Sequence, residues 1–233
     1  GSRAMCGRRD PDYLDSLRDE NGSAFYEAVT SAGRGGGHEN TASILSAALI
    51  PSGGIHAFVE LHIEQGPILE DENIDIGVVT HGQGLNWLQV TLTGKEAHTG
   101  STPMPKRVNA GLGMARITQL VDEIAWSHAP LAVGAVGHCD VYPNSRNIIP
   151  GKVVFTVDFR HPKQEVIDDM EARLRAGAAE ICKEIGLEMD IEQAGKFDPV
   201  EFDDGCVGAI RRAAQRLSLI HISEPTRPER IAY

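Results

Sequence analysis

Apolar and polar residues alternate with the two-residue period of a β-strand in several short stretches of the chain. The clearest case is GLNWLQVTLTG (84–94), where Leu88, Val90 and Leu92 fall on the side opposite Gln89 and Thr91. The other predicted strands are IHAFVELHI (55–63), IDIGVVT (74–80), AVGHCDVY (135–142), KVVFTVDFR (152–160) and LEMDIEQ (187–193).

Two long stretches show the helical period instead. Apolar residues recur at every third or fourth position in 108–124 and again in 164–185, so each stretch is expected to bury one stripe of a helix. Gly186 should end the second helix, because glycine readily adopts the left-handed conformation common after a helix. Shorter helices are predicted in NGSAFYEAV (21–29), with Asn21 or Ser23 as the N-cap, and in CVGAIRRAAQRL (206–217).

The order of these elements predicts an α/β fold. Strand, helix, strand, strand, helix, strand over residues 82–197 is the split βαβ order, a two-layer sandwich with both helices on one face of the sheet. We expect this βαββαβ unit to be inserted into a larger domain, of which 1–81 and 198–217 are parts. Residues 218–233 break the helical pattern at two prolines and resemble the translation of a sequencing adaptor. They are predicted to be non-native, and a native disordered tail is the alternative.

Composition indicates which binding partners and which cellular location the protein is expected to have. The 233 residues carry 33 acidic and 22 basic side chains, a net charge of -11, with no basic stripe. Nucleic acid and anionic membrane are therefore poor partners. The four cysteines form no CxxC pair, so we expect no disulfide framework and a cytoplasmic location. No apolar run approaches the length of a membrane span, and the N-terminal residues lack the apolar core of a signal peptide.

The segment ELHIEQGP (60–67) combines ionisable and apolar side chains. In an extended chain Glu60, His62 and Glu64 share one face, while Leu61 and Ile63 lie on the other. Such a face fits a strand that opens into a metal or acid-base site, and it also fits a strand with one solvated face. This segment by itself leaves both interpretations open.

Three further polar clusters stand at the ends of predicted elements: GKEAHTGSTPM (94–104), PNSRNIIPG (143–151) and VDFRHP (157–162). Each candidate residue also has a plain structural explanation. His62 could be a hydrogen-bonded structural histidine, and His98 could belong to a mobile loop. Asn147 could form a turn, and Arg160 could form a surface ion pair worth under about 1 kcal/mol.

Taken together and in order, the four clusters resemble the amidase, hydantoinase and carbamoylase branch of the M20 zinc hydrolases. His98 follows His62 by 36 residues, and Arg160 follows Asn147 by 13. The branch includes N-carbamoyl-L-amino acid hydrolases, β-ureidopropionases and allantoate amidohydrolases. The resemblance covers nearly all of residues 1–217. It implies a partial zinc-binding catalytic domain with an inserted lid, through which two copies form a homodimer.

The resemblance also implies roles for single residues. His62 corresponds to a ligand of one of two zinc ions, for which manganese or cobalt are possible substitutes, and Gln65 to a substrate-binding glutamine. His98 is implied to reach the partner subunit's site, to bind substrate there and to stabilise the oxyanion. Asn147 and Arg160 are implied to bind substrate, and a guanidinium suits a carboxylate. Glu60 and Glu64 could orient His62 from beside it.

The implied reaction is zinc-dependent hydrolysis of a non-peptide C–N bond in a ureido substrate that carries a carboxylate. N-carbamoyl-L-amino acids are the expected substrates, with allantoate or carbamoyl-β-alanine as alternatives. A peptidase of the wider M20 group fits ELHIEQGP and VDFRHP less well. A non-catalytic dimerisation or binding module is the alternative of another class.

The chain departs from the family at both ends. The HxD segment and the Glu-Glu pair that supply other zinc ligands and the catalytic base are absent, and so is the final histidine ligand. We therefore expect a fragment that is inactive by itself, because zinc binding requires several ligands at fixed geometry.

Overall fold

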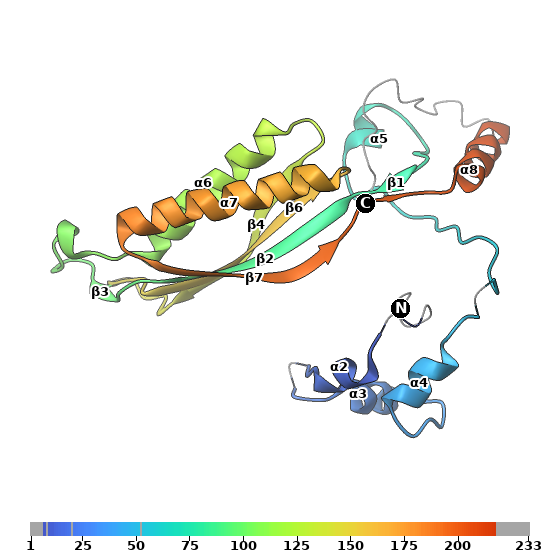
Figure 1. Ribbon diagram of the computed structural model, residues 1–233, viewed down its shortest axis with the longest axis horizontal. Coiled ribbons are helices and arrows are strands. Elements are labelled where there is room, and N and C mark those ends of the chain that lie inside the picture. The colour runs from blue at the N-terminus through green and yellow to red at the C-terminus, as the bar shows by residue number, and fades with distance from the viewer. Residues whose placement is uncertain (1–6, 8, 20, 52, 218–233) are drawn as a thin grey trace. The chain divides into compact units, whose positions relative to one another are not determined.

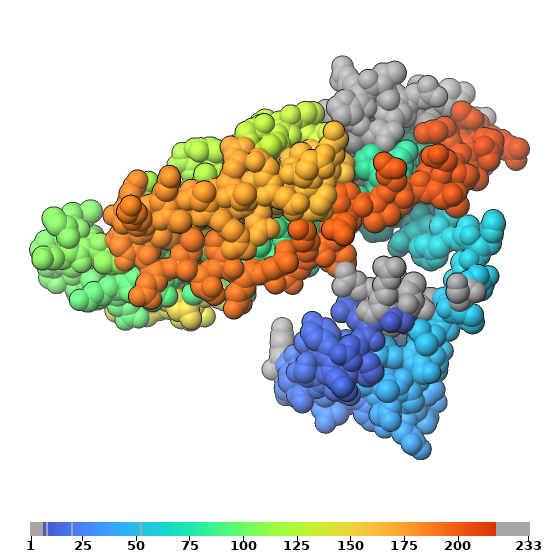
Figure 2. All heavy atoms as spheres, in the orientation of Figure 1, coloured from blue at the N-terminus to red at the C-terminus, as the bar shows by residue number. Residues whose placement is uncertain are grey.

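The computed structural model describes residues 7, 9–19, 21–51 and 53–217. The chain divides into two compact units, residues 1–61 and 62–233, and each is described by itself. Figure 1 shows the elements along the chain, and Figure 2 shows the same view with all heavy atoms.

The first unit consists of three short helices, α2 (Pro11–Ser16), α3 (Phe25–Ser31) and α4 (Thr41–Ala47). A hydrogen bond from the hydroxyl of the buried Thr41 to the Asp15 carboxylate ties α4 to α2. The predicted α3 exists, but neither Asn21 nor Ser23 caps it. The helix begins one residue later, after Ala24, and the Glu27 carboxylate accepts the Ala24 backbone N–H at 3.0 Å. This bond is one half of a capping box and satisfies the N–H of Ala24, while the alanine side chain supplies no acceptor for the first N–H groups of the helix.

The second unit contains the predicted sandwich, which we call the lid. Its elements are β2 (Gly84–Thr93), α6 (Ala110–Ser127), β4 (Val133–Tyr142), β6 (Lys152–His161), α7 (Gln164–Ile185) and β7 (Glu188–Phe197). The strands form one antiparallel sheet in the order β4-β6-β2-β7. Both helices cover the same face of this sheet (Figure 1), which confirms the α/β class and the split βαβ order.

The core of the lid lies between the sheet and the two helices. Alternate residues of β2 and β6 point into it, among them the fully buried Leu88, Phe155 and Phe159. Burying each such side chain contributes about 1.5–3 kcal/mol to the free energy of unfolding. The apolar residues of α7 pack against these side chains. The helix ends before Gly186, as predicted: Gly186 has a φ of 84°, and its N–H donates to Cys182 O at 2.8 Å.

The remaining elements of the second unit are short. They are α5 (Ile68–Asp71), β1 (His81–Gly82) paired with β8 (Val200–Glu201), β3 (Ala97–His98) paired with β5 (Ile148–Ile149), the 3-10 helix η1 (Met104–Lys106), and α8 (Asp204–Arg216). Helix α8 begins two residues before the predicted start, because the Asp203 carboxylate caps it by accepting the Cys206 N–H at 2.9 Å.

Two predicted strands are wrong. Residues 55–63 and 74–80 are not strands in the structure, and the apolar side of the first is exposed: Phe58 is 78% and Leu61 99% accessible. A strand is completed by a ladder of hydrogen bonds to a neighbour, and among the described residues no ladder runs along these segments, although Thr80 O at the end of the second accepts the Phe202 N–H at 2.8 Å. In 55–63 the alternating pattern marks an apolar face suited to burial, and the described residues leave that face exposed.

The predicted domain boundaries at 81/82 and 197/198 stay predictions, because the division by compactness falls at 61/62. The predicted non-native segment, 218–233, lies outside the described residues. Among the described helices, none is long and apolar enough to cross a membrane.

Candidate functional site

His98 and Asn147 lie next to each other at one end of the lid. Strand β3 pairs with β5, so that His98 is opposite Ile148, and the Thr99 N–H donates to Asn147 O at 2.9 Å. Both His98 and Asn147 are exposed. The side chain of Asn147 is also oriented, because its Oδ1 accepts the Ser145 hydroxyl at 3.0 Å. The ladder therefore fixes two residues that are distant in sequence as a pair.

The ring of His98 is held in one tautomer by its own loop. Its Nδ1 lies 3.1 Å from the Gly100 amide nitrogen and 3.2 Å from that of Ser101. A backbone N–H can only donate, so Nδ1 must accept both bonds and carries no hydrogen. In the neutral ring the hydrogen then sits on Nε2. The exposed edge of His98 thus presents an N–H donor, the type of group that stabilises a developing oxyanion.

Arg160 lies on the sheet face that the helices leave uncovered. Phe159 and His161 point to the helix side, so Arg160 and Asp158 project from the opposite face of β6. The Asp158 carboxylate accepts from Arg160 Nε (3.1 Å) and Nη2 (2.8 Å). This side-on ion pair orients the guanidinium, a planar group whose donors are suited to a carboxylate.

His161, next to Arg160, is a buried member of the VDFRHP cluster. It is only 5% exposed, and its Nδ1 accepts the Lys163 N–H at 3.0 Å. Desolvation by burial lowers its pKa below the ordinary histidine value and outweighs the backbone hydrogen bond with Lys163, which raises it; the charges of His128 and Lys163 lower the pKa further, and that of Glu165 raises it. His161 therefore packs as a neutral ring under the strand end that carries Arg160.

His98 and Asn147 lie at one end of the sheet, and Arg160 lies at the other. Asn147 precedes the Lys152 end of β6, close to the Gly94 N–H bond to Gly151 O (2.7 Å). Arg160 lies eight residues further along the same strand, which corresponds to about 27 Å at ~3.4 Å per residue. One substrate of amino-acid size cannot contact His98 and Arg160 of the same lid.

His62 and Gln65 belong to an exposed segment that precedes α5. The His62 ring contacts the carbonyl of Ile63, and Gln65 adopts a left-handed backbone with φ of 54°. Such a conformation is uncommon for a residue other than glycine and often marks a functional position. Glu64 does not contact His62, because its carboxylate accepts the N–H groups of Ile68 (3.1 Å) and Leu69 (3.0 Å) at the start of α5.

The described residues do not supply the ligand set of a zinc site. Among them, no group of three or more His, Cys, Asp or Glu side chains is arranged to hold a metal ion. His62 is one suitable ligand, whereas a zinc site needs at least three from the protein. The chain as described does not fit the implied metal centre, so we derive no metal step from it.

Two polar residues around the site were not singled out from the sequence. Asp158 stands two positions before Arg160, and two residues apart on a strand means the same face, a signal that could have identified it. Arg107 makes hydrogen bonds to the loop after His98, although it lies nine residues away. Only the tertiary structure shows that contact.

Comparison with known proteins shows which family and which relatives the chain is similar to. Residues 80–185 match the M20 family description "Peptidase dimerisation domain". The chain is 48% identical over 222 residues to an N-carbamoyl-L-amino-acid amidohydrolase from Rhizobium meliloti, a match that covers 95% of this chain and 51% of that protein. Residues 80–185 therefore form an M20 dimerisation domain. The resemblance inferred from the four clusters is thereby confirmed.

The chain is also similar to a second curated protein and to a solved structure. An Escherichia coli (strain K12) protein named allantoate amidohydrolase is 33% identical over 94% of this chain and 51% of its own length. A Burkholderia vietnamiensis structure described as an amidase of the hydantoinase/carbamoylase family is 44% identical, with a TM-score of 0.78 over 93% of this chain and 50% of that one. The chain thus spans about half the length of these relatives.

Proposed function

We propose that this chain is part of a hydrolase that cleaves a non-peptide C–N bond in a linear amide, with N-carbamoyl-L-amino acids as substrates. The observation that carries the proposal is the locked Nε2–H donor of His98, presented on an exposed edge beside Asn147. The name of the Rhizobium meliloti relative supports the choice of substrate. Allantoate, named in the Escherichia coli relative, is the alternative, since it also carries a carboxylate.

In the proposed reaction, each polar group of this chain has one task. Arg160, oriented by Asp158, binds the substrate carboxylate. His98 donates its Nε2–H to the carbonyl oxygen as negative charge develops there. His62 is the described residue proposed to ligate a metal ion, and a metal ion of the kind that the family implies would supply the activated water. Gln65 is proposed to contact the substrate beside His62.

The separation of His98 and Arg160 supports a site shared between two copies. A lid that places them near opposite ends of β6, whose span from Lys152 to Arg160 is about 27 Å, cannot bring both to one substrate, whereas a dimer can combine His98 and Asn147 of one copy with Arg160 of the other. This is consistent with the matched dimerisation domain. We therefore propose a homodimer as the working unit.

Of the two sheet edges, β4 is better suited to pair with a second copy. The β7 edge carries Glu188, Asp190 and Glu192, and a symmetric pairing there would bring like charges together. The β4 edge, VGAVGHCDVY, has a single carboxylate and exposes Val133 (43%) and Tyr142 (48%). Two β4 strands could thus extend the sheet across the dimer.

The proposal is tested in the full-length protein, assayed with an N-carbamoyl-L-amino acid, carbamoyl-β-alanine and allantoate. We expect the first to give the highest kcat/KM. His98→Gln should lower kcat by about a hundredfold, the loss typical of a removed oxyanion donor. Co-expressing His98→Gln with Arg160→Met should restore about a quarter of the activity, through mixed dimers that hold one intact site. Turnover that survives both single substitutions would contradict the proposal.

A further inference from the structure

The tautomer of His98 depends on where two backbone N–H groups lie. Gly100 and Ser101 form the turn that follows β3, and this turn is closed by a bond from the Thr102 N–H to His98 O at 3.2 Å. The ring packs tightly against the turn, because a Cβ added to Gly100 would lie 3.3 Å from His98 Cε1. If the turn shifted, Nδ1 would lose both donors and the ring could exchange its hydrogen between the two nitrogens.

Arg107, at the far end of the loop, donates hydrogen bonds to this turn. Its Nη2 donates to Thr99 O at 2.6 Å and its Nε to Thr102 O at 3.0 Å. These carbonyls belong to the residues on either side of Gly100 and Ser101, so one planar guanidinium spans the turn. A rigid fork with several donors is suited to two acceptors at once, which a lysine ammonium matches less well.

Arg107 is itself anchored by the lid. Its N–H donates to Met104 O at 3.2 Å within the turn of η1, and the next residue, Val108, accepts the Lys95 N–H at 2.9 Å. Arg107 is partly buried, and its two side-chain bonds both go to carbonyls of the His98 turn. Its side chain is therefore directed inward to the loop.

We propose that Arg107 is a positioning residue that locks His98 in the Nε2–H tautomer by clamping the carbonyls of Thr99 and Thr102. Its effect on turnover rests on the proposed function, whereas its effect on the ring does not. Arg107 contacts no reacting atom in this scheme. It acts by holding the turn whose amides keep Nδ1 as an acceptor, so that the exposed Nε2 always carries the donor hydrogen.

The structural part is tested on the 233-residue chain with ¹⁵N-labelled histidine. Long-range ¹H–¹⁵N spectra distinguish a protonated ring nitrogen from an unprotonated one, and His98→Gln identifies the His98 signals. In the unchanged chain we expect Nε2 protonated and Nδ1 unprotonated. In Arg107→Met both shifts should move toward the average of two exchanging tautomers. A wild-type His98 ring that already shows averaged shifts, or an Arg107→Met variant without change, would overturn the clamp.

Two variants and one further measurement separate the clamp from general effects. Lys106→Met removes a neighbouring exposed cation and should leave the His98 shifts unchanged. Arg107→Lys keeps the charge and should rescue the tautomer only in part, so full rescue contradicts the two-carbonyl clamp. Amide hydrogen exchange of Gly100 and Ser101 should accelerate in Arg107→Met while that of β6 stays the same, which shows that the lid remains folded.

Turnover tests the second part. In the full-length protein Arg107→Met should lower kcat about tenfold with little change in KM, whereas Lys106→Met should have no effect. If the His98 ring responds as expected but neither His98→Gln nor Arg107→Met changes kcat, the clamp stands and the proposed function fails. If His98→Gln lowers kcat and Arg107→Met changes neither the ring nor kcat, the clamp fails and the function stands.

Discussion

At the scale of residues, the site depends on how each functional side chain is held by a neighbour. His98 is held by two amides, Asn147 by Ser145, and Arg160 by Asp158. Such support reduces the conformational freedom that a side chain loses when it binds a ligand. The motifs identify the side chains that could carry chemistry, but the holding contacts mostly come from residues to which the motifs give no role.

The ion pair of Asp158 with Arg160 predicts an effect on substrate binding. In the full-length protein, Asp158→Asn should raise KM about two- to tenfold, equivalent to about 0.5–1.5 kcal/mol for ordering a long side chain, with a smaller change in kcat. Steady-state kinetics measure both. Asp190→Asn, an exposed carboxylate of β7, is the control and should leave KM unchanged. An unchanged KM in Asp158→Asn would show that Arg160 needs no such support.

The buried His161 predicts a pH dependence of stability. Its folded pKa lies below the ordinary 6.5, so between those two values the unfolded chain binds more protons than the folded one. The free energy of unfolding should therefore fall as the pH decreases through 6.5 and recover at higher pH. Asp168, whose pKa is lowered by its bond to Lys196, stabilises the fold above its ordinary pKa of 3.8 and loses this contribution only at lower pH, so it does not change the stability in this range.

Urea unfolding from about pH 8 to about pH 5, on both sides of the histidine value, measures this effect. Both tryptophans of the chain, Trp87 and Trp126, lie in the lid, so their fluorescence reports lid unfolding. His161→Gln should flatten the decrease below pH 6.5, whereas His138→Gln, an exposed imidazole, should preserve it. Equal slopes in the two variants would contradict this origin.

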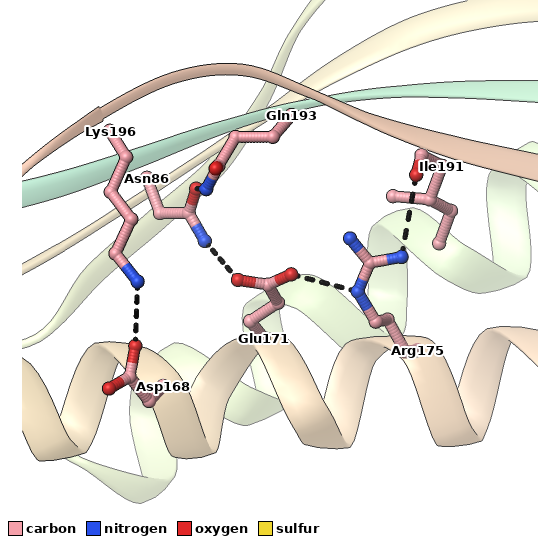
Figure 3. Close-up of polar contacts among 7 residues, drawn as sticks. All are labelled: Asn86, Asp168, Glu171, Arg175, Ile191, Gln193 and Lys196. Atoms are coloured by element: carbon pink, nitrogen blue, oxygen red, sulfur yellow. Dashed lines mark hydrogen bonds and ion pairs between the residues drawn. The ribbon is translucent and has the colours of Figure 1, made fainter.

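At the scale of elements, one buried amide joins β2, α7 and β7. Asn86 is fully buried, donates to the Glu171 carboxylate on α7 and accepts from Gln193 on β7 at 3.0 Å (Figure 3). Arg175 donates to the same Glu171 carboxylate at 2.8 Å, and its guanidinium also donates to Ile191 O at 3.4 Å. The network satisfies the polar groups of Asn86, and it fixes the helix over the strands.

Removing this amide should destabilise the lid. Asn86→Ala leaves the Glu171 carboxylate and the Gln193 amide without their shared partner, at a cost of about 1–3 kcal/mol. Gln193→Ala removes one bond of an exposed residue and should cost about 1 kcal/mol or less. Urea unfolding followed by tryptophan fluorescence gives both values. Equal losses in the two variants would mean that burial of Asn86 adds nothing.

The outer edge of β4, with which no described strand pairs, predicts the dimer interface. Ala135→Lys places a charge on this edge, and in a β4–β4 pairing it should weaken the dimer, because each copy carries the new charge into the interface. The matched change Ala194→Lys, on the β7 edge, should leave the dimer intact. Analytical ultracentrifugation measures the dissociation constants. Dissociation by Ala194→Lys and not by Ala135→Lys would assign the interface to β7.

At the scale of the whole molecule, the chain pairs a complete lid with an incomplete metal site. The sheet, both helices and their core are present, while the described residues offer His62 without two companion ligands. We predict that the 233-residue chain neither retains two zinc ions after dialysis nor hydrolyses N-carbamoyl amino acids, because one ligand does not hold a zinc ion. Metal analysis and an assay for released amino acid test this, and stoichiometric zinc with zinc-dependent turnover would refute it.

The sequence alone determined the lid. Alternation in 84–94 and the stripe of 164–185 identified a strand and a helix with little error, because their burial repeats at the period of their own element. The motif order also predicted the M20 family, which the comparisons confirmed. The same alternation failed in 55–63, since a pattern shows a face fit for burial and not whether a partner strand is there.

Tertiary structure decided what no local pattern contains. Asn147 stands beside His98 only because β5 pairs with β3, and Arg107 reaches the same turn only because η1 folds the chain back. Strand length sets the separation of His98 from Arg160, and this separation is the basis for proposing a shared site. These relations depend on contacts between residues far apart in the chain, whereas periodicity and motifs report on neighbours.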